Sequence, residues 1–123
     1  MLASGPKILD LSYLTEAADG DTNFIREILG DYLKEMNNYV LELNRGESQA
    51  DMALIGRIAH TIKGASANVG ASRVRETAGH LESQLRKGHL EGCTSLIHLL
   101  TQEIARVREL VERHTVEQLM QAS

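Results

Sequence analysis

The sequence predicts an all-α fold, an antiparallel up-down four-helix bundle with a short extra helix on its N-terminal side. Apolar residues recur at three- and four-residue spacing through most of the 123 residues, and no segment keeps the alternation typical of a strand. Four long amphipathic segments are joined by short connections, so successive helices should be antiparallel neighbours that bury their apolar stripes together.

The first two helices have recognisable beginnings. Asp10 can cap a short helix over Leu11–Ala18, which we expect to cover one end of the bundle. Asp21 then begins a long helix whose apolar stripe continues to a predicted end near Gly46. We expect residues 1–7 to form a flexible lead-in and residues 8–120 to form the bundle domain.

Glycines mark the ends of the next helices. The third is predicted from about Ser48 to about Val69, with Gly70 just beyond its end. The fourth has apolar residues on one face between positions 71 and 85 and should end by Gly88. The fifth has its apolar positions between 96 and 111, and a polar tail should follow.

Composition excludes several classes of protein. The net charge is −4 and aromatic residues make up only 3%, which disfavours a general polyanion binder and a base-stacking surface for nucleic acid. The single cysteine, Cys93, excludes an internal disulfide and fits a reducing compartment. Without a membrane-spanning apolar run or a visible signal peptide, the expected location is the cytoplasm. A four-helix core within one chain is also compatible with a monomer.

The face of the third helix around His60 is unusual. The apolar stripe lies nearly opposite His60, which should therefore face solvent. Gly56 and Gly64 stand four residues before and after it, although a glycine inside a helix costs roughly 1 kcal/mol relative to alanine. We expect the missing side chains to let another protein approach the imidazole closely. Arg57, Lys63 and Ala67 share this outer face.

The charges near His60 favour an anion. No Asp or Glu occurs between Met52 and Arg75, and this window carries a formal charge of +4 from four residues: Arg57, Lys63, Arg73 and Arg75. An exposed imidazole is a good nucleophile near pH 7, and a phosphoryl group on its ring would place negative charge near Lys63. The sequence contains no glycine-rich phosphate loop for ATP, and no carboxylate is expected beside His60 to act as a general base.

The segment from Ala59 to Ala71, AHTIKGASANVGA, resembles the signature of the histidine-containing phosphotransfer (HPt) domains of bacterial multistep phosphorelays. The pattern of His, two residues, Lys-Gly, small residues and Gly falls on His60, Lys63, Gly64 and Gly70. The resemblance extends over about residues 8–113 and includes the short first helix and the long second helix.

The resemblance implies a function and a set of partners. His60 would accept a phosphoryl group from the aspartate of one receiver domain, that of a hybrid sensor kinase, and pass it to the receiver aspartate of a response regulator. Lys63 would steady the phosphate and Gly64 would give it room. The receivers would supply Mg²⁺, so this chain would need no cofactor or metal of its own, and it would lack autokinase activity.

Other interpretations of these residues stay open. The chain could dock signalling partners without being phosphorylated, or His60 could be the general base of a small hydrolase, which would need a concave pocket and an orienting carboxylate. Ser66 and Asn68 could contact a partner or a bound phosphate, or could serve the helix end. His80 should lie on the surface. His89 and Cys93 stand four residues apart, but we expect Cys93 to be a buried structural thiol.

Overall fold

The computed structural model describes residues 7–123, so the predicted lead-in lies, except for Lys7, outside the described residues. Helices joined by short connections make up this part of the chain, which has no strand, and this confirms the predicted fold class. Residues 7–123 form six helices: α1 Ser12–Ala17, α2 Thr22–Ser48, α3 Met52–Val69, α4 Ser72–Arg86, α5 Cys93–Arg113 and α6 Val116–Gln121.

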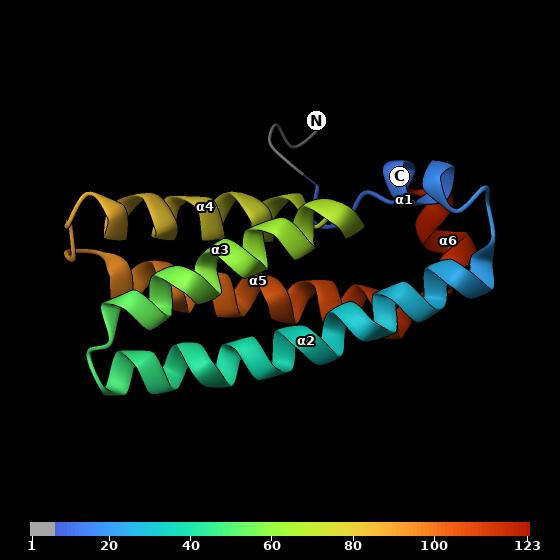
Figure 1. The fold of residues 1–123 in the computed structure, drawn as a ribbon. Helices are drawn as coiled ribbons and strands as arrows, with labels where there is room; N and C mark the ends of the chain where they lie inside the picture. The colour runs from blue at the N-terminus through green and yellow to red at the C-terminus, as the bar shows by residue number, and fades with distance from the viewer. Residues whose placement is uncertain (1–6) are drawn as a thin grey trace, which may run out of the picture.

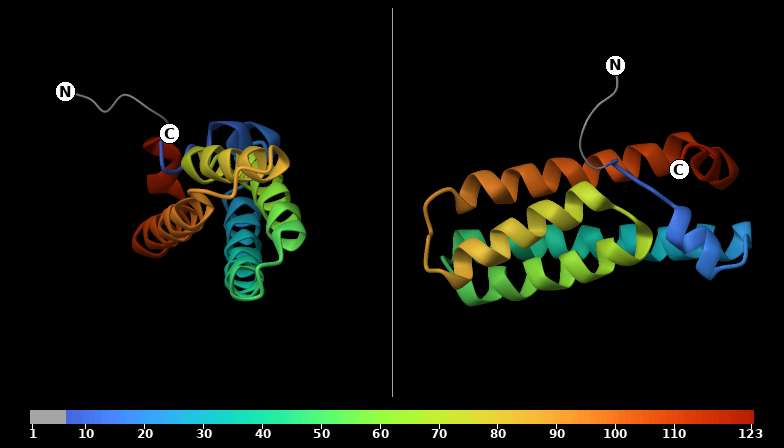
Figure 2. Two further views of the ribbon diagram at one scale, coloured as in Figure 1. Left: turned by 90° about the vertical axis from the view of Figure 1, so that its left-hand side faces the viewer. Right: turned by 90° about the horizontal axis from the view of Figure 1, so that it is seen from above.

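The four long helices α2 to α5 form the bundle, and each runs antiparallel to the one before it (Figure 1). The end-on and top views show α3 beside both α2 and α4, and α5 beside α4 (Figure 2). The short helices α1 and α6 lie together at one end of the bundle, as Figure 1 shows. The connections from α2 to α3 and from α4 to α5 lie at the opposite end.

One continuous apolar core runs along the bundle axis, made of Leu, Ile, Val, Ala and Met together with Tyr32 and Cys93. Each long helix contributes residues at three- and four-residue spacing, as a helix packed on one face requires. The largest fully buried side chains are Leu11, Ile25, Leu29, Met36, Leu43, Ile55, Ile62, Val74, Leu81, Leu100, Ile104 and Val107.

The connection between α2 and α3 differs from the prediction. Helix α2 does not end at Gly46 but continues to Ser48, and α3 begins at Met52 with Asp51 as its N-cap. Gly46 is buried, and a Cβ atom there would lie 2.8 Å from Cγ1 of Ile55. This glycine therefore permits the close approach of two helices and is not a helix terminator.

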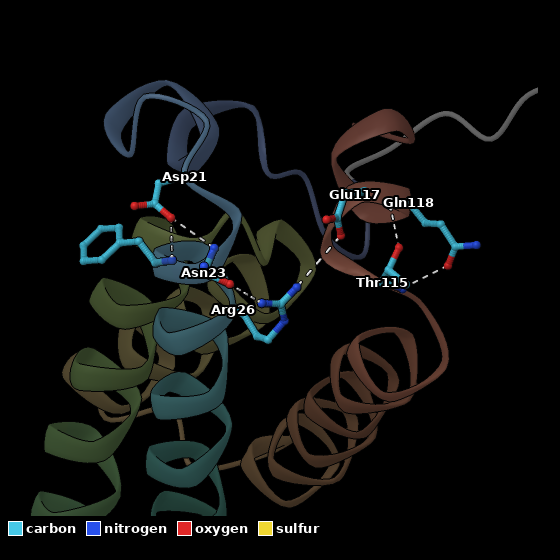
Figure 3. Close-up of polar contacts among 7 residues, drawn as sticks. Asp21, Asn23, Arg26, Thr115, Glu117 and Gln118 are labelled. Carbon is cyan, nitrogen blue, oxygen red and sulfur yellow. Dashed lines mark hydrogen bonds and ion pairs between the residues drawn. The ribbon is translucent and has the colours of Figure 1, made fainter.

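The predicted polar tail is in fact a sixth helix. The Thr115 side chain accepts a hydrogen bond from the backbone N–H of Gln118, and the Gln118 side chain accepts one from the backbone N–H of Thr115 (Figure 3). This capping box begins α6, whose Val116 and Leu119 are buried. Nη2 of Arg26 on α2 lies 4.0 Å from Oε1 of Glu117. Figure 3 marks this ion pair, which joins α2 to α6.

The N-terminal segment is held against the end of α3. The backbone N–H of Asp10 donates to the carbonyl of Gly70 over 2.9 Å, and that of Leu11 donates to Oγ of Ser123 over 2.8 Å. Leu11 and not Asp10 is the N-cap of α1, although Oδ1 of Asp10 accepts from the Ser12 N–H. These bonds fix α1 next to the end of the helix that carries His60.

Candidate functional site

His60 lies in the middle of α3 and points outward. Its side chain is 68% exposed, while Leu54, Ile58 and Ile62 of the same helix are buried in the core. The structure therefore agrees with the helical projection, in which the apolar stripe faces the core and the imidazole faces solvent.

The two glycines beside His60 differ in their surroundings. A Cβ atom at Gly64 would meet nothing within 4 Å, so this side of the ring is open. A Cβ atom at Gly56 would lie 3.9 Å from Cδ1 of Leu85, which is ordinary contact across to α4. A side chain at position 64 would therefore extend into open space on the outer face of α3, whereas one at position 56 would contact α4.

A carboxylate lies beside His60, contrary to the expectation from the sequence. Oε2 of Glu82 on α4 is 2.7 Å from Nδ1 of His60. The two residues are 22 positions apart and meet because α3 and α4 pack side by side. The acid-free window of the sequence covers α3 and only the beginning of α4, and Glu82, farther along α4, supplies the carboxylate beside His60.

Glu82 is the centre of a small ionic network. Its Oε1 lies 2.9 Å from Nζ of Lys63, and its Oε2 lies 3.6 Å from Nη2 of Arg86. The hydrogen bonds from Lys63 and then from His60 lower the pKa of Glu82, although partial burial acts in the opposite direction. Glu82 is therefore ionised at neutral pH and can only accept hydrogen bonds, so the ring proton of neutral His60 lies on Nδ1.

Nε2 is the ring nitrogen of His60 that is available to act as a nucleophile. No residue in the described range 7–123 makes a hydrogen bond to it. With the proton held on Nδ1, Nε2 carries the lone pair of the neutral ring, and the exposed position of the side chain gives a partner access to it.

Lys63 reaches Glu82 by crossing α4 at a glycine. A Cβ atom at Gly79 would lie 3.4 Å from Cδ of Lys63, in van der Waals contact with it. The aliphatic part of the lysine therefore lies over the bare backbone at Gly79. Its ammonium group is then close enough to His60 to share the same carboxylate.

A groove between α3 and α4 extends from His60 towards the N-terminal end of α3. Its volume is about 420 Å³. The sequence did not predict this concave surface. The groove is lined by Met52, Ala53, Gly56, Arg57, His60, Glu82, Leu85 and Arg86.

The remaining candidate residues divide into exposed and buried ones. Arg57, Ala67 and Asn68 are exposed, as a partner-binding role requires, although Asn68 lies towards α2 in a hollow that also includes Tyr32. Ser66 is fully buried, and its Oγ is 2.7 Å from the Tyr32 hydroxyl. The expected contact of Ser66 with a partner or phosphate is therefore wrong, because its side chain links two helices inside the core.

The other histidines and the cysteine form no second site. His80 is exposed, and Cys93 is buried with its Sγ 3.5 Å from the carbonyl of His89, so both lie where the sequence placed them. Burial raises the pKa of the Cys93 thiol. Within residues 7–123, no three His, Cys, Asp or Glu side chains are grouped to hold a metal ion. The same residues include no helix suited by length and apolarity to crossing a bilayer.

The sequence did not identify Glu82, Arg86 and Gly79 as site residues. They stand at spacings of three and four residues and so share one side of α4. That spacing is visible in the sequence, but it does not show that these residues face His60 unless the register between α3 and α4 is known.

Comparison with known proteins agrees with this geometry. The chain is 29% identical over 100 residues to histidine-containing phosphotransfer protein 4 of Arabidopsis thaliana, with 78% of this chain and 77% of the relative covered. It is 26% identical over 105 residues to the phosphorelay intermediate protein rdeA of Dictyostelium discoideum, covering 85% of this chain but only 41% of that protein.

The fold also has a counterpart among solved structures. The crystal structure of histidine-containing phosphotransfer protein B from Pseudomonas aeruginosa superposes with a TM-score of 0.80 at 24% identity, over 97% of this chain and 99% of the other. The profile of the Hpt domain matches residues 27–110, which is more than half of the chain and includes His60 and Glu82. The chain therefore belongs to the Hpt domain family.

Proposed function

We propose that His60 is the residue through which this Hpt domain acts as a phosphorelay carrier in two-component signalling. The observation that carries the proposal is the state of the His60 ring, which is exposed while its Nδ1 is held 2.7 Å from Glu82. Nε2 of such a ring is an accessible nucleophile for the phosphorus of an aspartyl phosphate. Receiver domains, which carry such phosphoaspartates, are therefore the partners.

Lys63 and Gly64 support this chemistry in different ways. Lys63 brings a positive charge beside His60, and an ammonium group can accompany a phosphoryl group as a point charge. Gly64 leaves the surface next to the ring without a side chain, so a receiver can bring its phosphoaspartate within bonding distance. The exposed Arg57 and Ala67 extend the surface on which the receiver lies.

We propose further details of the partners. One receiver would belong to a hybrid sensor kinase and the other to a response regulator, and each would supply its own Mg²⁺. The chain would act as a cytoplasmic monomer and obtain its phosphoryl group from other proteins, because its sequence has no phosphate loop for ATP.

The groove beside His60 and the carboxylate of Glu82 are also features of a hydrolase, the second candidate function. A histidine with an orienting carboxylate is part of many hydrolytic sites. The residues that line this groove include no Ser, Thr or Cys to act as nucleophile. A hydrolase with His60 as general base would therefore have to activate water, and it would leave no phosphate on the protein, whereas a carrier keeps the phosphoryl group on the His60 ring.

The test is phosphorylation by a receiver. Wild-type protein, His60→Gln and His80→Gln are each incubated with a phosphorylated receiver domain and Mg²⁺, and the protein-bound phosphate is assayed for acid lability and stability in base. We expect phosphohistidine on the wild type and on His80→Gln, the control that removes another exposed histidine, and none on His60→Gln. Equal labelling of His60→Gln would show that His60 is not the acceptor. Binding of the receiver without any labelling of the protein would favour the alternative in which the chain docks signalling partners without being phosphorylated.

A further inference from the structure

The group that holds the His60 ring is a carboxylate, and this has consequences once the ring is phosphorylated. Oε2 of Glu82 lies 2.7 Å from Nδ1, and the Glu82 side chain is only 15% exposed. An ionised carboxylate accepts hydrogen bonds and cannot donate them. A proton must therefore be present on Nδ1 for this contact to be favourable. The following inference rests on the proposed role of His60.

Phosphoryl transfer through Nε2 leaves that proton in place. The lone pair of Nε2 forms the N–P bond while the P–O bond to the receiver aspartate breaks, and the electron pair of that bond stays on the aspartate carboxylate. The ring thereby becomes a phosphoimidazolium that is still protonated on Nδ1. In the second transfer the N–P bond breaks towards a new aspartate oxygen, its electron pair returns to Nε2, and neutral His60 is regenerated.

Loss of the Nδ1 proton would interrupt this sequence. The leaving group would then be an imidazolate anion and no longer a neutral imidazole, so the N–P bond would break much more slowly. The Nδ1 lone pair would also face the Glu82 oxygen at hydrogen-bond distance, and two acceptors without a proton between them repel each other. The contact with Glu82 therefore opposes deprotonation of the phosphorylated ring.

Other charges near the ring act in the opposite direction. Arg57 and Lys63 on α3 and Arg86 on α4 are cations that favour loss of the Nδ1 proton. Lys63 and Arg86 contact Glu82, and no residue in the described part of the chain other than Glu82 is hydrogen-bonded to the ring. Arg86 is also largely exposed, so its charge is screened by solvent. The direct contact with Glu82 is the dominant effect.

We propose that Glu82 is a positioning residue that keeps Nδ1 of phosphorylated His60 protonated at neutral and mildly alkaline pH, and so extends the pH range over which the phosphoryl group can be passed on. A neutral amide at the same position could hold the ring in the same orientation. It would not compensate the positive charge of the phosphorylated ring.

The experiment compares three phosphorylated proteins: wild type, Glu82→Gln and Glu76→Gln. The last is the matched control, because it makes the same change of charge on an exposed position of the same helix, on a different face from Glu82. Each protein is phosphorylated by a receiver, and two rates are measured between pH 6 and pH 10: spontaneous loss of phosphate and transfer to a fresh receiver. Nitrogen-15 chemical shifts of the His60 ring report the protonation of Nδ1 directly.

We expect both rates to fall with rising pH in every protein, with the midpoint in Glu82→Gln lower than in wild type by about one pH unit or more, as an opposite charge at this distance implies. The nitrogen-15 titration should shift by the same amount, and Glu76→Gln should coincide with wild type. Glu82→Ala serves as a second variant and should shift in the same direction as Glu82→Gln.

The outcomes separate the two proposals. If Glu82→Gln and Glu82→Ala are phosphorylated and give the wild-type pH profile and nitrogen-15 titration, Glu82 does not hold the proton and the inference is overturned, while His60 remains the acceptor. If wild type itself takes no phosphate on His60, the proposed function has failed instead.

Discussion

The side chain of Lys63 crosses the backbone of α4 at Gly79, where a Cβ atom would lie 3.4 Å from Cδ of the lysine. From there Nζ reaches Oε1 of Glu82 at 2.9 Å. A glycine inside a helix lowers helix stability by about 1 kcal/mol relative to alanine. Gly79 therefore weakens α4 locally, and in return the ammonium group of Lys63 is directed towards the acceptor histidine.

Gly79→Leu should separate helix stability from function. The new side chain would occupy the path of Lys63 and move its ammonium group away from Glu82 and His60. We expect phosphoryl transfer from a receiver to slow by about tenfold, corresponding to a charge-assisted contact of about 1.4 kcal/mol. The free energy of unfolding, measured in urea, should stay constant or rise by up to about 1 kcal/mol.

The control for Gly79→Leu is Gly30→Leu. Gly30 is also inside a helix, α2, and a Cβ atom there would meet nothing within 4 Å. It should gain helix stability in the same way and transfer phosphate at the wild-type rate. Equal transfer rates for the two variants would show that the path over Gly79 does not matter.

Lys63→Met removes the charge of Lys63 and keeps most of the aliphatic chain over Gly79. We expect slower transfer from the receiver or a shorter lifetime of the phosphohistidine, since no ammonium group accompanies the phosphoryl group. Lys34→Met, at an exposed lysine on α2, should behave like wild type in both assays. Wild-type transfer rate and lifetime in Lys63→Met would remove the proposed role of Lys63.

The free energy of unfolding of Lys63→Met should also depend on pH differently from that of wild type. The pKa of Glu82 is lowered from 4.5, with Lys63 as the main cause, so the ionic network stabilises the fold above about pH 4.5 and loses this contribution as the pH falls further. At pH 7 we expect Lys63→Met to be less stable by up to about 1 kcal/mol, because the lysine is partly exposed. The difference from wild type should narrow as the pH falls below 4.5 in urea denaturation. A difference that stays constant as the pH falls would come from packing and not from charge.

Gly64→Leu tests the access argument. The substitution fills open space next to His60 on the outer face, so the fold should tolerate it and α3 should gain helix propensity. A receiver could no longer bring its phosphoaspartate to bonding distance, and we expect transfer to fall roughly 100-fold, as for other misplaced reacting groups. The assay follows label from a phosphorylated receiver, with Gly30→Leu as the control. A wild-type rate in Gly64→Leu would refute the argument that the bare surface provides access.

Much of this fold could be predicted from the sequence because its helices follow one repeating pattern. Leu54, Ile58 and Ile62 recur every four residues, and that periodicity alone gave both the buried face of α3 and the outward direction of His60. Helix α6 was missed because six residues with only Val116 and Leu119 buried are too few to show a period.

Only the neighbours of His60 within its own helix could be predicted from the sequence. Gly64 and Lys63 are neighbours of His60 within the same helix, so their spacing determines their positions. Glu82 comes from another helix, and its position opposite His60 depends on how far α3 and α4 are displaced along each other. Packing of the core determines that displacement, and no local pattern in the sequence reports it.

Ser66→Ala tests the structural role of Ser66. The substitution leaves the buried hydroxyl of Tyr32 without its partner at 2.7 Å, which should lower the free energy of unfolding by about 1–3 kcal/mol. The double variant Tyr32→Phe with Ser66→Ala should be more stable than Ser66→Ala alone, because neither polar group remains. Phosphoryl transfer by folded Ser66→Ala should match wild type. A large loss of transfer without a loss of stability would restore a direct role for Ser66 in binding.

Because Tyr32 is buried, we expect the free energy of unfolding to fall at alkaline pH. Burial raises the pKa of Tyr32 from 10.0 to about 12, so the folded state keeps the hydroxyl protonated where the unfolded chain would ionise. The stabilisation is complete below pH 10 and is lost as the pH rises from 10 through 12. Tyr32→Phe should lack this part of the alkaline loss in denaturation measured between pH 9 and pH 12. Identical alkaline profiles would mean that Tyr32 ionises freely in the folded protein.

Gly70→Ala should be among the most damaging changes outside the apolar core. Gly70 has φ of +79°, and a Cβ atom there would lie 1.7 Å from the backbone oxygen of Asp10. An alanine at position 70 would have to adopt the left-handed backbone conformation, which costs about 1 kcal/mol. Its Cβ atom would also clash with Asp10, so the N-terminal segment, which is hydrogen-bonded to Gly70 through the Asp10 N–H, would have to move. We expect the free energy of unfolding to fall by more than about 2 kcal/mol. Gly88→Ala is the matched control, because its φ is +76° and its Cβ would meet nothing within 4 Å, so it should show only the backbone cost of about 1 kcal/mol. If the two variants lose equal stability, the contact between Asp10 and Gly70 contributes nothing, and α1 is held to the bundle by its other contacts alone.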